Sequence, residues 1–183
     1  DMGNNDTALV FYMKALELYK ELNDLGGQSL INGNVGEVHA VLNEHDEAYT
    51  SYIKALQQAE KINDKWQQAN MYSCLGSLLT DQAKHNNALS FLNQGLKIYE
   101  ELNANPEMID IYESMAQAYE QKGDLMQANH NLKKANELRD EIFNKENASS
   151  VAEMNALYET KEKEAELLKQ QEQAKYEASQ KQM

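Results

Sequence analysis

The chain has 183 residues, of which 42% are hydrophobic, and its 17 basic and 30 acidic side chains give a formal net charge of −13. Binding to nucleic-acid phosphates requires clustered Lys and Arg, so the acidic balance argues against a nucleic-acid partner and is accounted for by solubility alone. Because no run of about 18 apolar residues is present, we expect no membrane span within this chain, and its start does not read as a signal peptide.

Hydrophobic periodicity predicts a chain made almost entirely of helices, and the content of one Pro and eight Gly favours few irregular loops. Gly26 and Gly27 are expected to end the first helix in the left-handed conformation, and Pro106 is placed in the first turn of a later helix. Cys74 lies in a predicted helix and is expected to be a buried free thiol. The predicted helices cover residues 5–23, 28–42, 46–62, 66–82, 86–103, 107–121 and 125–143.

A polar stretch at residues 144–150 is expected to break or cap the helix before it, and a second long helix is predicted over 151–178. Its apolar side chains form a thin line that resembles a coiled-coil seam, although Lys161 and Glu172 would lie in it. A solvated helix without a partner fits the pattern equally well. The apolar line consists of Val151, Met154, Tyr158, Ala165 and Leu168.

The segment HNNALSFLNQGLKIYEELN, residues 85–103, recurs in outline every 40 residues along the chain. Three columns emerge when the copies are placed in register, and each column keeps one size of side chain. The first and third columns are small and the second is large, which predicts the same packing four times. The columns are Ala8, Ala48, Ala88 and Ala128; Tyr12, Tyr52, Leu92 and Leu132; and Ala15, Ala55, Gly95 and Ala135.

Helix pairs with a small residue in the first helix and this Ala, large, Ala pattern in the second resemble tetratricopeptide repeats. The matching residues of the first helices are Val35-Gly36, Leu75-Gly76, Met115-Ala116 and Tyr119. The standard unit has about 34 residues, so a period of 40 implies longer helices. A HEAT-like helical pair shares the period but not the Ala and Gly pattern. The resemblance implies an all-α fold, an α-solenoid of helix-turn-helix pairs followed by a long C-terminal helix.

The predicted domains are the solenoid at residues 1–146 and the long helix at residues 147–183. Residues 5–23 resemble the second helix of a repeat whose first helix is missing, so we expect the sequence to begin inside a longer solenoid with three full repeats after it. Phe11, Tyr12 and Leu16 would then face a missing partner helix.

Residues 139–171 resemble the segment that comes after such repeats in sensor proteins of Bacteroidetes. In those proteins the helix leads to a membrane span and then to a histidine kinase or a DNA-binding output domain. The resemblance implies a sensory module of a two-component system, on the periplasmic side of an inner membrane, with the long helix as a coiled-coil linker able to form a homodimer. The alternatives are a stand-alone scaffold or adaptor and a cytoplasmic location. The matching residues are Asp140, Ile142, Phe143, Asn144 and Glu146, then Tyr158, Glu159, Thr160, Lys163 and Glu164.

No pattern of catalytic, cofactor-binding or metal-binding residues emerges. The four histidines, His39, His45, His85 and His130, have no ligand spacing with one another or with Cys74, and His45 and His85 are expected to be exposed turn residues. Since no phosphate-binding loop or nucleophile motif occurs either, we expect no enzyme activity, cofactor or metal in this chain.

The resemblance places the first helices of the repeats on a concave face, where a protein or peptide partner would bind. Residues 28–42, 66–82 and 107–121 contain no Lys or Arg, which excludes the carboxylate clamp that grips an acidic peptide C-terminus. An acidic groove favours a basic or neutral segment, and a groove without a ligand is the alternative. The candidate groove residues are Asn34, Glu37, Asn70, Ser73, Ser77, Asp81, Asp110, Glu113, Gln117 and Glu120.

Overall fold

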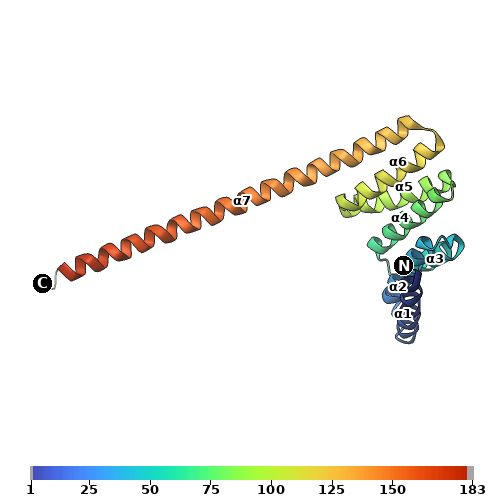
Figure 1. Ribbon diagram of the computed structural model, residues 1–183, viewed down its shortest axis with the longest axis horizontal. Helices are drawn as coiled ribbons and strands as arrows, with labels where there is room; N and C mark the ends of the chain where they lie inside the picture. The colour runs from blue at the N-terminus through green and yellow to red at the C-terminus, as the bar shows by residue number, and fades with distance from the viewer. Residues whose placement is uncertain (1, 181–183) are drawn as a thin grey trace. The chain divides into compact units, whose positions relative to one another are not determined.

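The structure, a computed structural model, describes residues 2–180, with side chains described for residues 5–164, 166 and 171. Every element in this part of the chain is an α-helix, which confirms the all-α solenoid (Figure 1). The first six predicted helices begin and end within about three residues of the observed ones, and the seventh begins at its predicted residue, Leu125, but continues past its predicted end at residue 143. The helices are α1 (Met2–Glu21), α2 (Leu25–Val41), α3 (His45–Lys61), α4 (Lys65–Asp81), α5 (His85–Leu102), α6 (Asn105–Lys122) and α7 (Leu125–Gln180).

The turns between helices recur every 20 residues, because the two helices of a repeat are equally long. Each turn contains one residue in the left-handed conformation, where Asn and Gly are tolerated best. The first turn uses Asn23, with φ of 52°, whereas Gly26 and Gly27 lie within α2, so the predicted role of these two glycines is wrong. The left-handed residues are Asn23, Asn43, Asn63, Ala83, Asn103 and Gly123.

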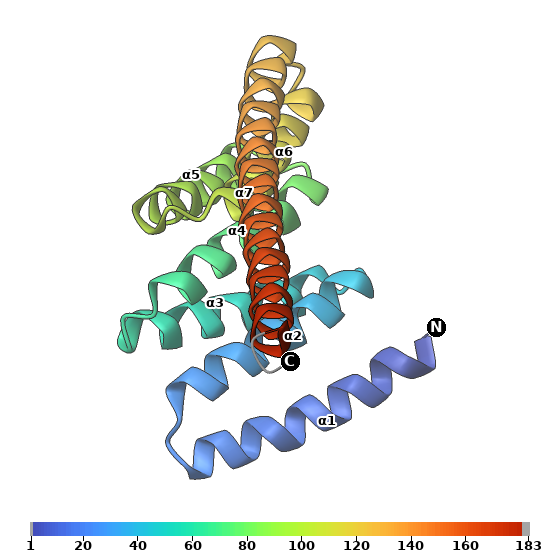
Figure 2. The same cartoon turned by 90° about the vertical axis from the view of Figure 1, so that its left-hand side faces the viewer.

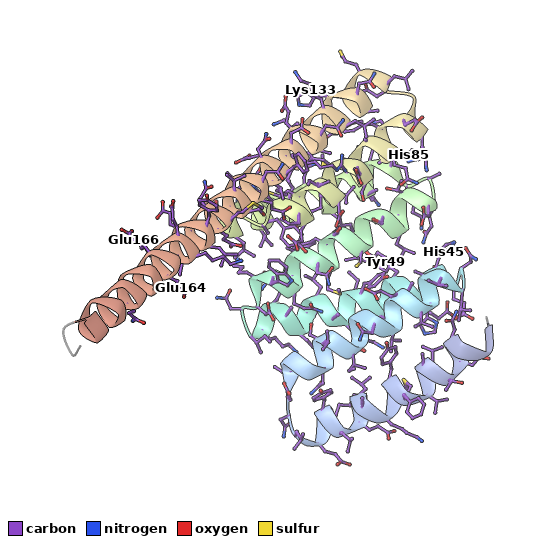
Figure 3. All side chains as sticks on the ribbon, turned by 60° about the vertical axis from the view of Figure 1, so that its left-hand side comes forward. His45, Tyr49, His85, Lys133, Glu164 and Glu166 are labelled. Atoms are coloured by element: carbon purple, nitrogen blue, oxygen red, sulfur yellow. The ribbon has the colours of Figure 1, made fainter. Side chains whose placement is uncertain are left out.

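From α2 to α5, the helix starts alternate between residues that cap the helix with a side chain and residues that do not. Asp24 and Asp64 cap α2 and α4, each accepting a hydrogen bond of 3.0 Å from the amide three residues later. α3 and α5 instead begin at His45 and His85 and have no side-chain cap. Both histidines are half-buried, and the Nδ1 atom of each is buried without a hydrogen-bond partner, so the prediction of exposed turn residues is wrong. Figure 3 shows them at the same edge of the stack.

From α1 to α6 each helix packs on the next, and α4 also contacts both α2 and α6, which gives the stack of layers in Figure 2. The predicted columns are buried in the middle of the stack. Ala48, Ala55, Ala88 and Leu92 each have 0% of their surface exposed.

Leu132 departs from the large column because 45% of its surface is exposed. Its counterpart Tyr52 packs in one cluster with Met71 and Leu75 of α4, the first helix of the next pair. Leu132 belongs to the last pair among the described residues, and no further pair covers it there.

At the other end of the stack, Leu16 packs against Ile31 and Val35 of α2, and Tyr12 contacts this cluster. The expectation that both face a missing partner is therefore wrong for Leu16, which is 7% exposed. Phe11 is 64% exposed, as expected for a residue of that outer surface.

The chain divides into two compact units, residues 1–139 and 140–183, and α7 belongs to both. The expected helix break at residues 144–150 is wrong, because α7 continues through them. α7 contains neither Gly nor Pro, and residues 144–150 are exposed, so no packing competes with their helical conformation. The domain boundary at residue 146 stays a prediction. Ala165, Leu168 and Glu172 of the predicted seam lie outside the residues whose side chains are described.

None of the helices over residues 2–180 combines the length and apolar content needed to cross a bilayer.

Within unit 1, close contact between the helices of a pair depends on glycine. A Cβ atom at Gly36 would lie 2.6 Å from Cδ1 of Tyr52, and a Cβ atom at Gly76 would lie 2.4 Å from Cγ of Leu92. These distances confirm that the helices approach closely at the position where the repeat pattern has a small residue.

We expect Gly76→Ala to lower the free energy of unfolding by about 1–3 kcal/mol, because the added methyl group overpacks against Leu92 and the backbone of Ala88. Urea unfolding followed by circular dichroism measures this change. Gly33→Ala is the matched control, since its Cβ atom would lie 3.1 Å from the flexible end of Met71. Equal stability losses in the two variants would contradict the close-packing argument.

Candidate functional site

The ten predicted groove residues lie on α2, α4 and α6, and none of them is buried. Asn34, Asn70, Ser73 and Ser77 are half-buried, and the other six are exposed. Residues 40 positions apart occupy equivalent places on equivalent helices, so these side chains belong to one surface of the stack. Their assignment to a ligand groove stays a prediction.

The chemistry of this surface changes from one first helix to the next. On α2, Leu30 and Val41 are 51% and 71% exposed, and their apolar side chains were missed by the sequence prediction. Their counterparts 40 residues later are Asn70 and Asp81 on α4. The surface therefore passes from an apolar α2 region to an acidic α6 region.

At the α6 region, Asp110 and Glu113 are the central acidic groups. Burial raises the pKa of the Asp110 carboxyl above its usual value, and the nearby Glu113 and Glu107 raise it further, while Arg139 lowers it. Asp110 therefore lies in a negative potential that a cation relieves.

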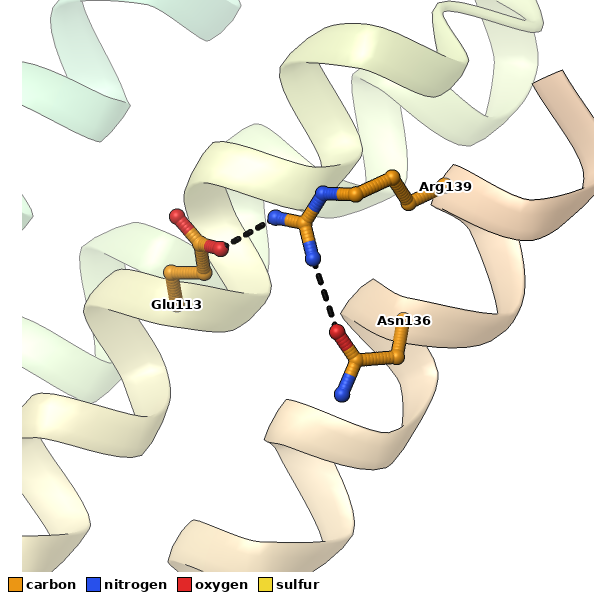
Figure 4. A network of polar contacts seen from close by, with 3 residues as sticks. All are labelled: Glu113, Asn136 and Arg139. Atoms are coloured by element: carbon orange, nitrogen blue, oxygen red, sulfur yellow. Dashed lines mark hydrogen bonds and ion pairs between the residues drawn. The ribbon is translucent and has the colours of Figure 1, made fainter. Parts of the chain in front are cut away.

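Arg139 supplies such a cation, although the first helices themselves contain no Lys or Arg in the predicted segments. Its Nη2 atom donates to Oε1 of Glu113 at 2.5 Å, and its Nη1 atom donates to Oδ1 of Asn136 at 2.7 Å (Figure 4). Sequence reasoning missed Arg139 because it lies on α7. The 40-residue period could have revealed it, because Arg139 is the charged residue at a position where the earlier repeats have Tyr19, Ala59 and Tyr99.

In the α4 region, small polar side chains join the helices. Ser77 and Ser114 have their Oγ atoms 3.4 Å apart across α4 and α6, and the thiol of Cys74 donates to Oδ1 of Asn70 at 3.9 Å. Cys74 is a free, half-buried thiol. Burial and the Glu37 carboxylate raise its pKa from 9.0 to about 12. The thiol is therefore protonated and unreactive at neutral pH.

Polar and charged side chains over the described residues form no cluster of three or more His, Cys, Asp or Glu suited to a metal ion. Of the acidic residues of the α6 region, Glu113 pairs with Arg139. Their arrangement can attract a cationic side chain, which is a binding property.

We expect Cys74 to react with dithionitrobenzoate at pH 8 at least about a hundredfold more slowly in the folded protein than in urea, because thiolate is the reacting species and a raised pKa depletes it. The absorbance of the released thiol measures the rate. Glu37→Gln should accelerate the reaction, and Glu47→Gln, on the exposed part of α3, should leave it unchanged. Equal rates in folded and unfolded protein would contradict the assigned environment.

Comparison with known families supports the repeat pattern. The sequence profile described as Tetratricopeptide repeat matches residues 27–101 and 67–141. It decides against the HEAT-like alternative. Comparison with curated protein sequences gave no match.

Several solved structures share the fold at low sequence identity. BtubC from P. vanneervenii is 20% identical, with a TM-score of 0.70 over 76% of this chain, which spans 58% of the length of BtubC. The TPR domain of Arabidopsis FLU is 22% identical, with a TM-score of 0.56 over 58% of this chain and 90% of that one. MamA is 22% identical, with a TM-score of 0.53 over 79% of this chain and 83% of that one.

Tetratricopeptide repeats form a non-catalytic scaffold for protein partners, in agreement with the expectation of protein binding without enzyme activity in this chain. The tetratricopeptide repeat profile matches more than half of the sequence, from α2 into the first part of α7. The chain belongs to the tetratricopeptide repeat family.

Proposed function

We propose that this chain is the sensory, protein-binding part of a bacterial signal-transduction protein, whose parent is a membrane-bound sensor histidine kinase. The observation that carries the proposal is α7, which begins in the last repeat and continues without Gly or Pro into unit 2. The resemblance of residues 139–171 to the corresponding segment of Bacteroidetes sensors supports it. A periplasmic location is inferred from the same resemblance, with the cytoplasm as the alternative.

A stand-alone scaffold or adaptor is the second candidate, and the protein-binding fold favours it equally. The two candidates differ in the sequence expected beyond Met183 in the reading frame. An apolar run of about 20 residues and a kinase or DNA-binding domain there would support the sensor. A stop codon there would contradict the sensor and leave the scaffold.

The proposed ligand of the groove is a basic or neutral segment of a protein, and an acidic C-terminus is disfavoured. Glu37, Asp81, Asp110 and Glu120 are exposed on the groove helices, and the raised pKa of Asp110 reflects repulsion between neighbouring carboxylates as well as burial. A cationic partner relieves this repulsion, whereas a second carboxylate adds to it. Arg139 already relieves it at Glu113, so a basic ligand there competes with Arg139.

We expect a labelled peptide of alternating Arg and Gly to bind more tightly than one of alternating Glu and Gly, with the difference reduced by salt. Glu113→Gln should weaken binding of the Arg peptide about two- to fivefold and Arg139→Gln should strengthen it by a similar factor, the range of an exposed ion pair. Fluorescence anisotropy measures both changes.

Glu137→Gln is the matched control for this experiment, because Glu137 is an exposed carboxylate on α7 that pairs with Lys133, whose position Figure 3 labels. This variant should change the affinity for the Arg peptide less than about twofold, because an exposed ion pair contributes little. Tighter binding of the Glu peptide than of the Arg peptide would overturn the electrostatic argument.

A homodimer through the C-terminal helix is the proposed route to a signal. Val151, Met154, Leu157 and Tyr158 are each more than half exposed. They recur at the spacing of three and four residues that pairs helices in a coiled coil. The exposed apolar line favours a partner over a bare helix.

We expect the full chain to dimerise at high concentration and a chain that ends at Ser149 to remain monomeric, because the shortened chain lacks the apolar line. Sedimentation equilibrium measures the mass of both. Met154→Glu should weaken the dimer of the full chain, and Glu153→Gln, on the neighbouring exposed position, should not. Monomers in both chains would remove the support for a dimerising helix.

A further inference from the structure

A cavity of about 420 Å³ opens between α1, α2 and α3 and shares no residue with the candidate groove. Met13 and Leu16 of α1 and Val35 of α2 provide its apolar part. Leu16 and Val35 belong to a buried cluster, so this side of the cavity is formed by the core of the stack. Its volume lies in the range of about 300–1,000 Å³ that is usual for ligand pockets.

At the position of this cavity, the first repeat lacks two aromatic rings that the second repeat has. Tyr72 and Phe91, on α4 and α5, stack with ring centroids 6.1 Å apart at an interplanar angle of 30°. Both rings pack against the central core cluster. The residues 40 positions earlier are Asn32 and Ser51, and both line the cavity.

Hydrogen bonds hold the Asn32 side chain in place, so that it does not fill the cavity. Asn32 is 6% exposed and donates from Nδ2 to Oε1 of Gln58 at 2.8 Å. Gln58 in turn donates from Nε2 to Oε1 of Gln28 at 3.1 Å. The amide of Asn32 is therefore tied to α3, and the neighbouring hydroxyl of Ser51 is too small to fill the space that Phe91 fills in the next repeat.

The charged residues of the lining are balanced in sign. Lys20 and Lys54 carry positive charge, and Asp46 and Glu47 carry negative charge. An apolar wall with a rim of both signs suits an uncharged group of aromatic size, whereas an ion would meet opposing charges. The second repeat supplies the example of such a group, since a phenyl ring occupies the equivalent place.

We propose that this cavity binds an aromatic side chain of a partner protein, which inserts where the first repeat lacks its own ring. Aromatic side chains are the usual anchors of protein interfaces when a pocket receives them. The surface is separate from the groove and does not depend on the proposed function. Shape and apolar contact would select the ligand of the cavity, whereas charge would select the ligand of the groove.

The test is a titration of the isotopically labelled full chain with acetyl-Gly-Phe-Gly-amide, followed by the backbone amide signals in NMR spectra. The Phe tripeptide should shift the amides of Leu16, Val35 and Ser51, and acetyl-Gly-Ala-Gly-amide should leave them in place. Ser51→Phe introduces the side chain of the next repeat. It should weaken the Phe tripeptide at least about tenfold, because its own ring takes the cavity, and should raise the melting temperature.

Ser149→Phe is the matched control, because it adds the same side chain at an exposed position of α7. It should leave both tripeptide responses as in the unaltered chain. Ser51→Leu is a smaller filling variant that serves if Ser51→Phe does not fold, and it should weaken the Phe tripeptide in the same direction.

Equal responses to the Phe and Ala tripeptides, or unchanged Phe binding in a folded Ser51 variant, would overturn the proposal. Shifts at the same amides on raising the protein concentration alone would assign the cavity to a second copy of the chain. Shifts with benzyl alcohol as large as those with the Phe tripeptide would assign it to a small aromatic compound. Each of these two outcomes also overturns the proposed occupant.

Discussion

The close contact between the two helices of each repeat is the constraint on which the rest of the structure depends. Gly36 meets Tyr52 and Gly76 meets Leu92 at distances that leave no room for a Cβ atom. Each contact places a large side chain of a second helix against a first helix, with buried small residues one turn away on either side: Ala48 and Ala55 beside Tyr52, and Ala88 and Gly95 beside Leu92. Because both helices and their turns have the same length, the contact recurs every 40 residues and stacks the pairs.

A scaffold maintained by buried columns leaves the exposed positions free to differ between repeats. The position of Leu30 on α2 becomes Asn70 on α4 and Asp110 on α6, so the chemistry of one surface changes while its backbone repeats. Arg139 enters the acidic region from α7, at a place where earlier repeats have an aromatic or a small residue. Binding properties arise at such differences, because identical repeats present identical surfaces.

The cavity of the first repeat and the thiol of the second also lie where the repeats differ. Asn32 and Ser51 replace the stacked rings of Tyr72 and Phe91, and a space remains that the hydrogen bonds of Asn32 keep open. Burial of Cys74, with the nearby Glu37 carboxylate, raises the pKa of its thiol and makes it less reactive. In both places the exception to the repeat determines the local chemistry.

The sequence alone determined the all-α fold, the 40-residue period and the buried columns, because helical periodicity and packing size are local properties that the chain repeats. It also predicted a groove on the first helices, in the segments 28–42, 66–82 and 107–121 that contain no Lys or Arg. Tertiary structure decided what depends on neighbours from other repeats: the exposure of Leu132, the ion pair of Arg139 with Glu113, the burial of Nδ1 in His45 and His85, and the cavity beside Ser51. It also decided that α7 crosses residues 144–150 as one helix, since a polar stretch ends a helix only where capping or packing favours another conformation.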